Sequence, residues 1–315
     1  MNLKTPAYAL LTALLLGACQ DKTEAPAAPK ADTAQTAPSA DKSEAAENES
    51  EETEEAESET EGKGVAVNDP LLQEFADLTE KVRGELQNGK NVEKSYTRHR
   101  ADVEKLVEKI STAKQDFLEN YHDDANWQND KPTAELRAQQ KQLRAVGLEY
   151  WDLGEGMVEI RPVADYYVKL FGKAADKDLR EFLKLEADDN KQLIYNDGAL
   201  AVAWDDLANR IAAWENWAGE YPQSTFNKQV ADTLKNYRRT YLFGEDNTPV
   251  AEDDGILLPE VEKEWTRFVQ AHPNSETAQM VEEAKRYWKA RQDKGGEEPD
   301  LSGYSAPFKN LRQYD

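Results

Sequence analysis

From Asn68 onward, apolar residues recur every three or four positions, which is the spacing of an amphipathic helix. Asp69-Pro70 opens the first run, because Asp can cap a helix and Pro lacks only an N–H that the first turn leaves unpaired. Asn88-Gly89 closes this run. The pattern therefore predicts one long helix between these two boundaries. The positions expected to face its core are Leu72, Phe75, Leu78 or Thr79, Val82 and Leu86.

Two more apolar runs follow in the first half of the chain. The second run places on one face Val103, Val107, Ile110, Phe117 and Tyr121. The third run begins at Pro132 and comprises Leu136, Leu143, Val146, Tyr150 and Leu153. Lys114 interrupts the second run, where its aliphatic stem can cover apolar neighbours. We expect the first two runs to pair as antiparallel helices, and residues 68–160 to form a helical hairpin or three-helix region.

The second half of the chain contains an internal repeat. The stretch 214–237 aligns with the stretch 265–288 at an offset of 51 residues. Upstream, the Asp-Gly pairs at 197–198 and 254–255 align at an offset of 57, which predicts a first helix six residues longer in the first unit. The sequence of each unit predicts, in order, an Asp-Gly turn, a helix, a Pro-containing turn and a second helix capped by Ser. The aligned pairs include Trp214 with Trp265, Trp217 with Phe268, Pro222 with Pro273, Ser224 with Ser275, and Tyr237 with Trp288.

Residues 196–292 resemble tetratricopeptide-type helical arrays, in which a similar aromatic-Pro-x-Ser turn joins the helices, although the period here is longer than theirs. The resemblance implies stacked helical hairpins and assigns no functional residue. A helix pair leaves an apolar face that a neighbouring pair must cover. We therefore expect an all-α fold, in which an irregular repeat array of stacked helical hairpins (161–294) packs on residues 68–160 and precedes a C-terminal tail (295–315).

The segment before these helices is strongly acidic. Residues 20–67 hold fourteen Asp or Glu against four Lys, and their low apolar content cannot offset the entropy of ordering the chain. We expect a disordered acidic tether, acting either as a solvated spacer or as bait for a basic partner or a divalent cation. Of the formal charge of −23, this segment carries −10 and Lys4 carries +1, which leaves −14 for residues 68–315. That charge argues against a nucleic-acid partner.

The single cysteine, Cys19, follows a short apolar run that begins three residues after Lys4. A charged start, a short apolar run and small residues before a cleavage point are typical of a secretory signal peptide. The residues Leu16-Gly17-Ala18-Cys19 resemble the lipobox of bacterial lipoprotein precursors.

The lipobox resemblance implies a signal peptide over residues 1–18 and a diacylglycerol on the Cys19 sulfur. It also implies a further acyl chain on the new amino group, so that the protein would be held to a membrane through lipid. Gln20, in place of the Asp that favours the inner membrane in that family, indicates the outer membrane, on either its periplasmic or its surface face. The alternative is a free cysteine in an ordinary signal peptide.

Four carboxylates stand three or four residues apart in the stretch 147–162: Glu149, Asp152, Glu155 and Glu159. On a continuous helix several of them would share a face, which would suit acid–base catalysis or Ca²⁺ binding. Gly154 and Gly156 instead predict that the helix ends, with residues 157–160 in a short extended segment. This reading makes the stretch structural.

Other candidate chemistry is sparse. The three histidines, His99, His122 and His272, are not spaced as helical metal ligands, and His122 beside two Asp residues fits either a metal site or a frayed helix end. The Asp-Gly stretches lack the EF-hand ligands, and the sequence contains no catalytic triad, cysteine nucleophile or nucleotide loop. We therefore predict no cofactor and no metal. Trp214 and Trp217 stand at core spacing, with a groove for a peptide or glycan as the alternative.

Three functions are compatible with these features. The first is a lipid-anchored envelope protein whose helical region binds another envelope component, as a scaffold or assembly factor, without enzymatic activity. The second is a surface-exposed lipoprotein that acts as an adhesin or nutrient-capture factor. The long acidic tether is the feature that supports this alternative. The third is a carboxylate-dependent enzyme acting on cell-wall or polysaccharide substrates through residues 149–159.

Overall fold

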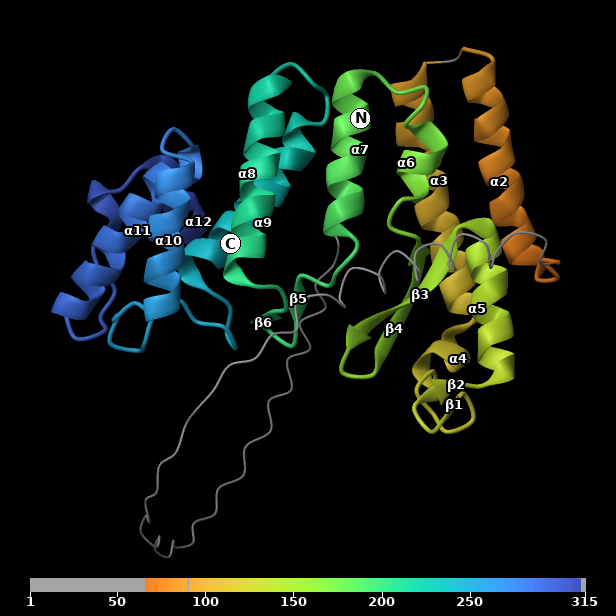
Figure 1. Ribbon diagram of the computed structural model, residues 1–315, viewed down its shortest axis with the longest axis horizontal. Helices are drawn as coiled ribbons and strands as arrows, with labels where there is room; N and C mark the ends of the chain where they lie inside the picture. The colour runs from red at the N-terminus through yellow and green to blue at the C-terminus, as the bar shows by residue number, and fades with distance from the viewer. Residues whose placement is uncertain (1–65, 90, 313–315) are drawn as a thin grey trace, which may run out of the picture. The chain divides into compact units, whose positions relative to one another are not determined.

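The computed structural model describes residues 66–89 and 91–312, which form eleven helices and three two-stranded sheets (Figure 1). Helices dominate this part of the chain, so the predicted all-α class is confirmed. None of these helices is both long and apolar enough to cross a membrane. The predicted signal peptide, Cys19 and the acidic tether up to residue 65 lie outside the described residues.

The first predicted helix is α2 (Pro70–Gln87), which packs against α3 (Val92–Ala113) as expected. The Asp69 carboxylate accepts a hydrogen bond from the Leu71 amide at 2.9 Å, and so caps α2 at the predicted position. Apolar burial then holds the two helices in place. Their buried apolar residues include Leu72, Phe75, Val82, Val103 and Ile110.

The second apolar run does not form one continuous helix. α3 ends where Lys114 leaves the helical conformation (φ −111°, ψ 15°), and the short helix α4 (Gln115–Glu119) follows. The Lys114 ammonium lies 2.9 Å from the Asp69 carboxylate that caps α2. The charged end of Lys114 is therefore paired at the interruption. Tyr121, the last residue of the run, is buried beyond both helices.

The third helix starts later than predicted. Pro132 lies in the strand β2 (Lys131–Pro132), which pairs with β1 (Trp127–Gln128). Thr133 caps α5 (Ala134–Val146) by accepting a hydrogen bond from the Leu136 amide at 3.3 Å. Gly147 ends α5 in the left-handed conformation (φ 87°), which glycine adopts without a steric cost.

Tyr150 and Leu153 were expected on the third helix, but they lie in a β-hairpin. The hairpin joins β3 (Leu148–Gly154) to β4 (Met157–Pro162), and its register pairs Leu148 with Pro162. The predicted extended segment after the glycines is therefore confirmed, and the helix ends earlier than the apolar spacing indicated. Apolar spacing over so few residues does not separate a helix from a half-buried strand.

The second half of the chain builds two helical hairpins. Its helices and strands are α6 (Tyr166–Phe171), α7 (Lys177–Asp189), β5 (Tyr195–Asn196), β6 (Ala199–Leu200), α8 (Trp204–Glu220), α9 (Asn227–Phe243), α10 (Pro259–Ala271) and α11 (Glu276–Asp293). α8 packs on α9 and α10 on α11, while α8 contacts α10 and α9 contacts α11. The first helix is longer in the first hairpin, with 17 residues against 13. The first helices therefore differ by four residues and not by the predicted six. The segment between the Asp-Gly turn and the helix is also longer in the first unit, which accounts for the rest.

Two clusters of buried apolar residues hold this part of the chain together. One lies among α2, α3, α5 and the β3–β4 hairpin, and it includes Phe75, Ile110, Leu143 and Ile160. The other runs from α7 to α12 (Ala306–Arg312) and also takes in Tyr96 of α3. Residues of α6 pack against both clusters. α6 therefore links the two halves of the fold.

The residues expected to form a C-terminal tail are folded as far as Arg312. α12 follows a short 3₁₀ helix (Leu301–Gly303) and packs against α9. Phe308 is fully buried, with its ring centroid 5.3 Å from that of Phe243. This segment covers an apolar face of the second half of the chain.

Candidate binding pocket between two helical hairpins

The four carboxylates of the stretch 147–162 do not meet at one site. In a hairpin successive side chains point to opposite faces, so Glu149 and Glu159 share one face and Asp152 lies on the other. Glu155 occupies the turn with a positive φ of 53°, and its neighbour is Asp197 of another turn. The Asp197 carboxylate raises the pKa of Glu155.

Glu149 is held in ion pairs. Its carboxylate lies 3.0 Å from the Arg161 guanidinium, which stands opposite it in the hairpin, and 3.5 Å from that of Arg144. The Arg161 guanidinium also lies over the Trp151 ring and donates to the Asn190 carbonyl at 2.8 Å. These contacts connect the hairpin to the end of α7. Glu149 thus has a structural role in the hairpin.

The histidines are separate from one another. His99 is 1 % exposed, and its Nε2 lies 2.8 Å from the Tyr166 hydroxyl. Burial lowers the pKa of His99 to about 4, so the ring is neutral near neutral pH. His122 stacks on Trp127 and lies 3.3 Å from Asp152. Across residues 66–89 and 91–312, no group of three His, Cys, Asp or Glu side chains is arranged to hold a metal.

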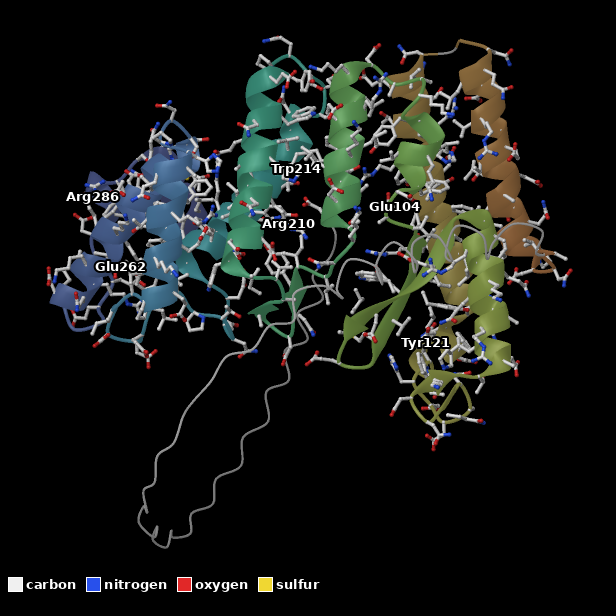
Figure 2. The ribbon with its side chains drawn as sticks, in the orientation of Figure 1. Glu104, Tyr121, Arg210, Trp214, Glu262 and Arg286 are labelled. Carbon is white, nitrogen blue, oxygen red and sulfur yellow. The ribbon has the colours of Figure 1, made fainter. Side chains whose placement is uncertain are left out.

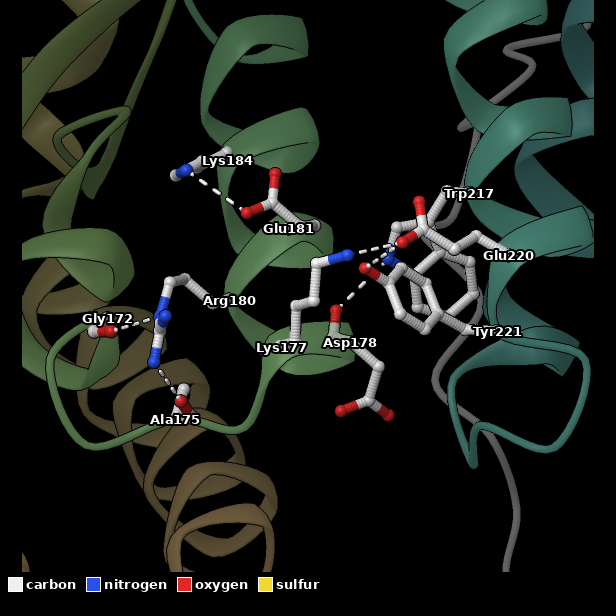
Figure 3. Close-up of polar contacts among 10 residues, drawn as sticks. All are labelled: Gly172, Ala175, Lys177, Asp178, Arg180, Glu181, Lys184, Trp217, Glu220 and Tyr221. Atoms are coloured by element: carbon white, nitrogen blue, oxygen red, sulfur yellow. Dashed lines mark hydrogen bonds and ion pairs between the residues drawn. The ribbon is translucent and has the colours of Figure 1, made fainter.

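Trp214 and Trp217 are core residues with exposed fractions of 2 % and 3 %. Trp214 extends from α8 toward α7, where its indole N–H donates to the Asp189 carboxylate at 2.7 Å (Figure 2). The Trp217 indole donates to the Asp178 carbonyl at 3.0 Å, and Lys177 lies beside it (Figure 3). Both indole hydrogen bonds therefore connect α8 to α7. The expectation that tryptophans at this spacing are core residues is confirmed for these two.

The turns of the two hairpins have the same backbone geometry. Tyr221 ends α8 with φ −122° and ψ 57°, and His272 ends α10 with φ −131° and ψ 55°. The amide of Ser224 then donates to the Tyr221 carbonyl, and the amide of Ser275 donates to the His272 carbonyl, each at 3.0 Å. The aligned sequences thus produce matching turns. That the two hairpins are repeats of one structural unit stays a prediction.

A pocket of about 450 Å³ opens between the first hairpin and the turn of the second. Its polar lining includes a carboxylate and a guanidinium from α8 and α9, together with the side chains of the 271–276 turn. The lining residues are Ala212, Glu215, Asn216, Ala218, Leu234, Arg238, Ala271, His272, Pro273, Asn274, Ser275 and Glu276. A volume of this size is within the range of small-ligand pockets.

A buried ion network forms one wall of the pocket. Arg238, whose side chain is 10 % exposed, donates to Glu215 Oε1 at 2.6 Å and to Thr277 Oγ1 at 2.8 Å. Its remaining terminal nitrogen lies 3.0 Å from the Glu276 carboxylate. Glu215 Oε1 also accepts hydrogen bonds from the amide and the hydroxyl of Thr277, at 2.9 and 2.7 Å. Glu215 therefore serves as an acceptor for the first turn of α11 and joins the two hairpins.

The sequence pattern does not predict this pocket. One signal was present, because Arg238 follows Leu234 by four residues on the face of α9 where the helical period expects an apolar side chain. Its partners lie 23 and 39 residues away along the chain. Their proximity follows from the packing of α8, α9 and α11, which the sequence pattern does not specify.

No protein-family model, curated protein or solved structure matches this chain.

Proposed function

We propose that this protein is a lipid-anchored component of the cell envelope, whose helical hairpins bind another envelope component as a scaffold or assembly factor. The observation that carries the binding role is the 450 Å³ pocket between the α8–α9 hairpin and the 271–276 turn. The lipobox-like residues ending at Cys19 support the lipid anchor, and Gln20 after them supports an outer-membrane location.

The pocket is suited to binding because its walls are held in advance. The Glu215–Arg238–Thr277 network joins the two hairpins, so the lining does not need to be ordered when a ligand arrives. Preorganisation of this kind reduces the entropic cost of binding. The carboxylates proposed for catalysis lack such an arrangement, since Glu149 is paired and Asp152 lies on the opposite face.

The anchor is tested by replacing Cys19 with Ser in cells that produce the protein. A hydroxyl is a far poorer nucleophile than a thiolate, so Cys19→Ser should lose the lipid mass and move from the detergent extract to the soluble fraction. Intact-mass spectrometry measures the lipid mass, and fractionation measures how much protein stays with the membrane. A mutant that stays in the membrane fraction would contradict the lipid anchor.

The binding role is tested by a photocrosslinking amino acid placed at Asn274, at the rim of the pocket. The matched control places the same amino acid at Asn236, an exposed position of α9 that does not line the pocket. We expect a discrete adduct, dependent on light, from position 274 only. Identical adducts from both positions, or none from either, would remove the support for a partner at this pocket.

A further inference from the structure

His99 of α3 is a buried ring whose hydrogen bonds are only half made. It is 1 % exposed, and its Nε2 lies 2.8 Å from the Tyr166 hydroxyl of α6. That hydroxyl lies 2.7 Å from the Thr79 hydroxyl of α2, which donates to the Phe75 carbonyl at 3.1 Å. The His99 Nδ1 is buried and has no hydrogen-bond partner among the described residues. A chain of hydrogen bonds therefore joins α2, α6 and α3, and the far nitrogen of the ring is left unpaired.

This position suits a neutral ring better than a charged one. A neutral imidazole has one donor and one acceptor nitrogen, whereas the protonated ring has two donors. Protonation of His99 inside the fold would place a charged Nδ1–H where no described acceptor reaches it. A buried charged donor without a partner is costly. The ring therefore stays neutral for as long as α6 covers it.

Neighbouring charges do not offset the cost of burial. The charged side chains around His99 and the two α6 tyrosines that contact it, Tyr166 and Tyr167, are Arg83 and Glu85 of α2 and Arg98, Arg100 and Asp102 of α3. Glu85 is ion-paired with Arg98. Burial is the largest influence on the pKa of His99 and lowers it to about 4, although Asp102 and Glu85 act to raise it. Uncovering the ring therefore increases its affinity for a proton.

His99 packs on the helix that links the two clusters of buried residues. Its ring stacks on that of Tyr166, with centroids 5.9 Å apart, and its centroid lies 5.8 Å from that of Phe171. Tyr166 belongs to the cluster around α2, α3 and α5, and Phe171 belongs to the cluster that runs from α7 to α12. Because α6 has only six residues and its N-cap residue makes no side-chain hydrogen bond, its position depends on such packing. A change of charge at His99 therefore acts on the link between the two halves of the fold.

We propose that His99 makes the α6 link an acid-sensitive hinge. At neutral pH the uncharged ring lets α6 dock on α2 and α3. When α6 moves away, water reaches Nδ1 and the ring takes up a proton, and the charged ring then opposes redocking. This inference goes beyond the proposed function, because it concerns a movement within the fold and needs no partner.

The pKa of His99 in the two states sets the pH range of the hinge. It is about 4 when α6 is docked, against the ordinary value of 6.5 when water reaches the ring. Docking is therefore at full strength above pH 6.5 and is lost as the pH falls toward 4, because in that range only the open state binds the proton. A fall from about pH 7.5 to about pH 5.5 should raise the open fraction of α6 ~10-fold.

The test is amide hydrogen exchange of the full chain in detergent, read by mass spectrometry at these two pH values and corrected for the intrinsic exchange rate. We expect protection of the α6 amides to fall ~10-fold at the lower pH, and protection of the α9 amides to change less than ~2-fold. No loss of protection in α6 would overturn the inference. An equal loss in α6 and α9 would overturn it too, because acid would then destabilise the whole fold without a hinge.

Two variants assign the effect to the ring of His99. His99→Phe keeps an aromatic ring beside Tyr166 and Phe171, and His99→Gln keeps a side chain that can hydrogen-bond the Tyr166 hydroxyl, but neither takes up a proton in this pH range. We expect the acid-dependent loss at α6 to shrink below ~2-fold in both variants. His122→Gln, at an exposed histidine, should keep the ~10-fold loss. A ~10-fold loss that persists in either His99 variant would show that other groups cause it, and the parent profile decides the matter if a variant does not fold.

Discussion

The α8–α9 and α10–α11 hairpins share a sequence pattern and a turn, but their aligned residues have different partners. Trp214 and Trp265 are both buried, yet Trp214 donates to the side chain of Asp189, while Trp265 donates to the backbone carbonyl of Tyr241 at 3.1 Å. The element packed against each tryptophan differs, since α7 precedes the first hairpin and α9 precedes the second. The pattern therefore sets which positions are buried, and the neighbouring element sets what they bind.

The two serines differ in the same way. Ser275 caps α11 by accepting from the Ala278 amide at 2.9 Å. Ser224 donates instead to the Asp178 carboxylate at 2.7 Å, and α9 starts three residues later at Asn227. The predicted Ser cap is thus confirmed in the second hairpin and wrong in the first. The Ser224 hydroxyl also accepts from the Phe226 amide at 3.4 Å, but Phe226 precedes the first residue of α9.

The largest expected effect is the loss of either tryptophan. Trp214→Ala and Trp265→Ala each remove a large buried side chain, and we expect each to lower the free energy of unfolding by ~3–5 kcal/mol. Urea denaturation followed by circular dichroism measures the change. Glu262→Ala, on the exposed side of α10, should stay within about 0.5 kcal/mol of the parent (Figure 2). Full stability in both tryptophan variants would show that their burial does not support the hairpins.

A smaller effect is expected at Asp189 of α7, which accepts from Trp214, whereas the aligned Trp265 donates to a backbone carbonyl. Its carboxylate accepts from Arg210, Trp214 and the Tyr237 hydroxyl, at 2.7–2.8 Å. Burial, together with this carboxylate, raises the pKa of Tyr237, so the phenol stays protonated and donates. Asp189→Ala leaves all three donors without this acceptor, and should cost about 2–4 kcal/mol of unfolding free energy.

The control for Asp189 is its exposed neighbour Asp188, which pairs only with Lys191 in the described structure. Asp188→Ala should change the unfolding free energy by about 0.5 kcal/mol or less. The midpoints of urea unfolding measure the difference in unfolding free energy between the two variants, provided that both have the same denaturant slope. Equal midpoints would mean that the α7–α8 contact does not depend on the Asp189 carboxylate.

The smallest effect separates the serines. Ser275→Ala removes a helix cap and should cost about 1 kcal/mol, with faster hydrogen exchange at the first amides of α11. Ser224→Ala removes a contact to α7 and should leave exchange at the first amides of α9 unchanged. Amide exchange read by mass spectrometry distinguishes them. Faster exchange at the start of α9 in Ser224→Ala would assign both serines the same capping role.

Much of the fold was accessible from local signals. The Asp69 cap, the buried face of α2 and the turns ending at Tyr221 and His272 each depend on residues within a few positions of one another. Errors arose where a short apolar run fits either a strand or a helix, as at Tyr150 and Leu153. The folded segment before Arg312 was missed because its burial depends on distant aromatic residues such as Phe243.

The sequence by itself determined the helical class, the positions that are buried in each hairpin and the shape of the two turns, because these follow from the helical period and from local backbone chemistry. Only the tertiary structure decided that Glu149 is paired with Arg161, and that Glu215, Arg238 and Thr277 meet at a pocket. Those contacts join residues on different elements. Their distances depend on how the elements pack, and side-chain spacing along a single helix contains no information about that packing.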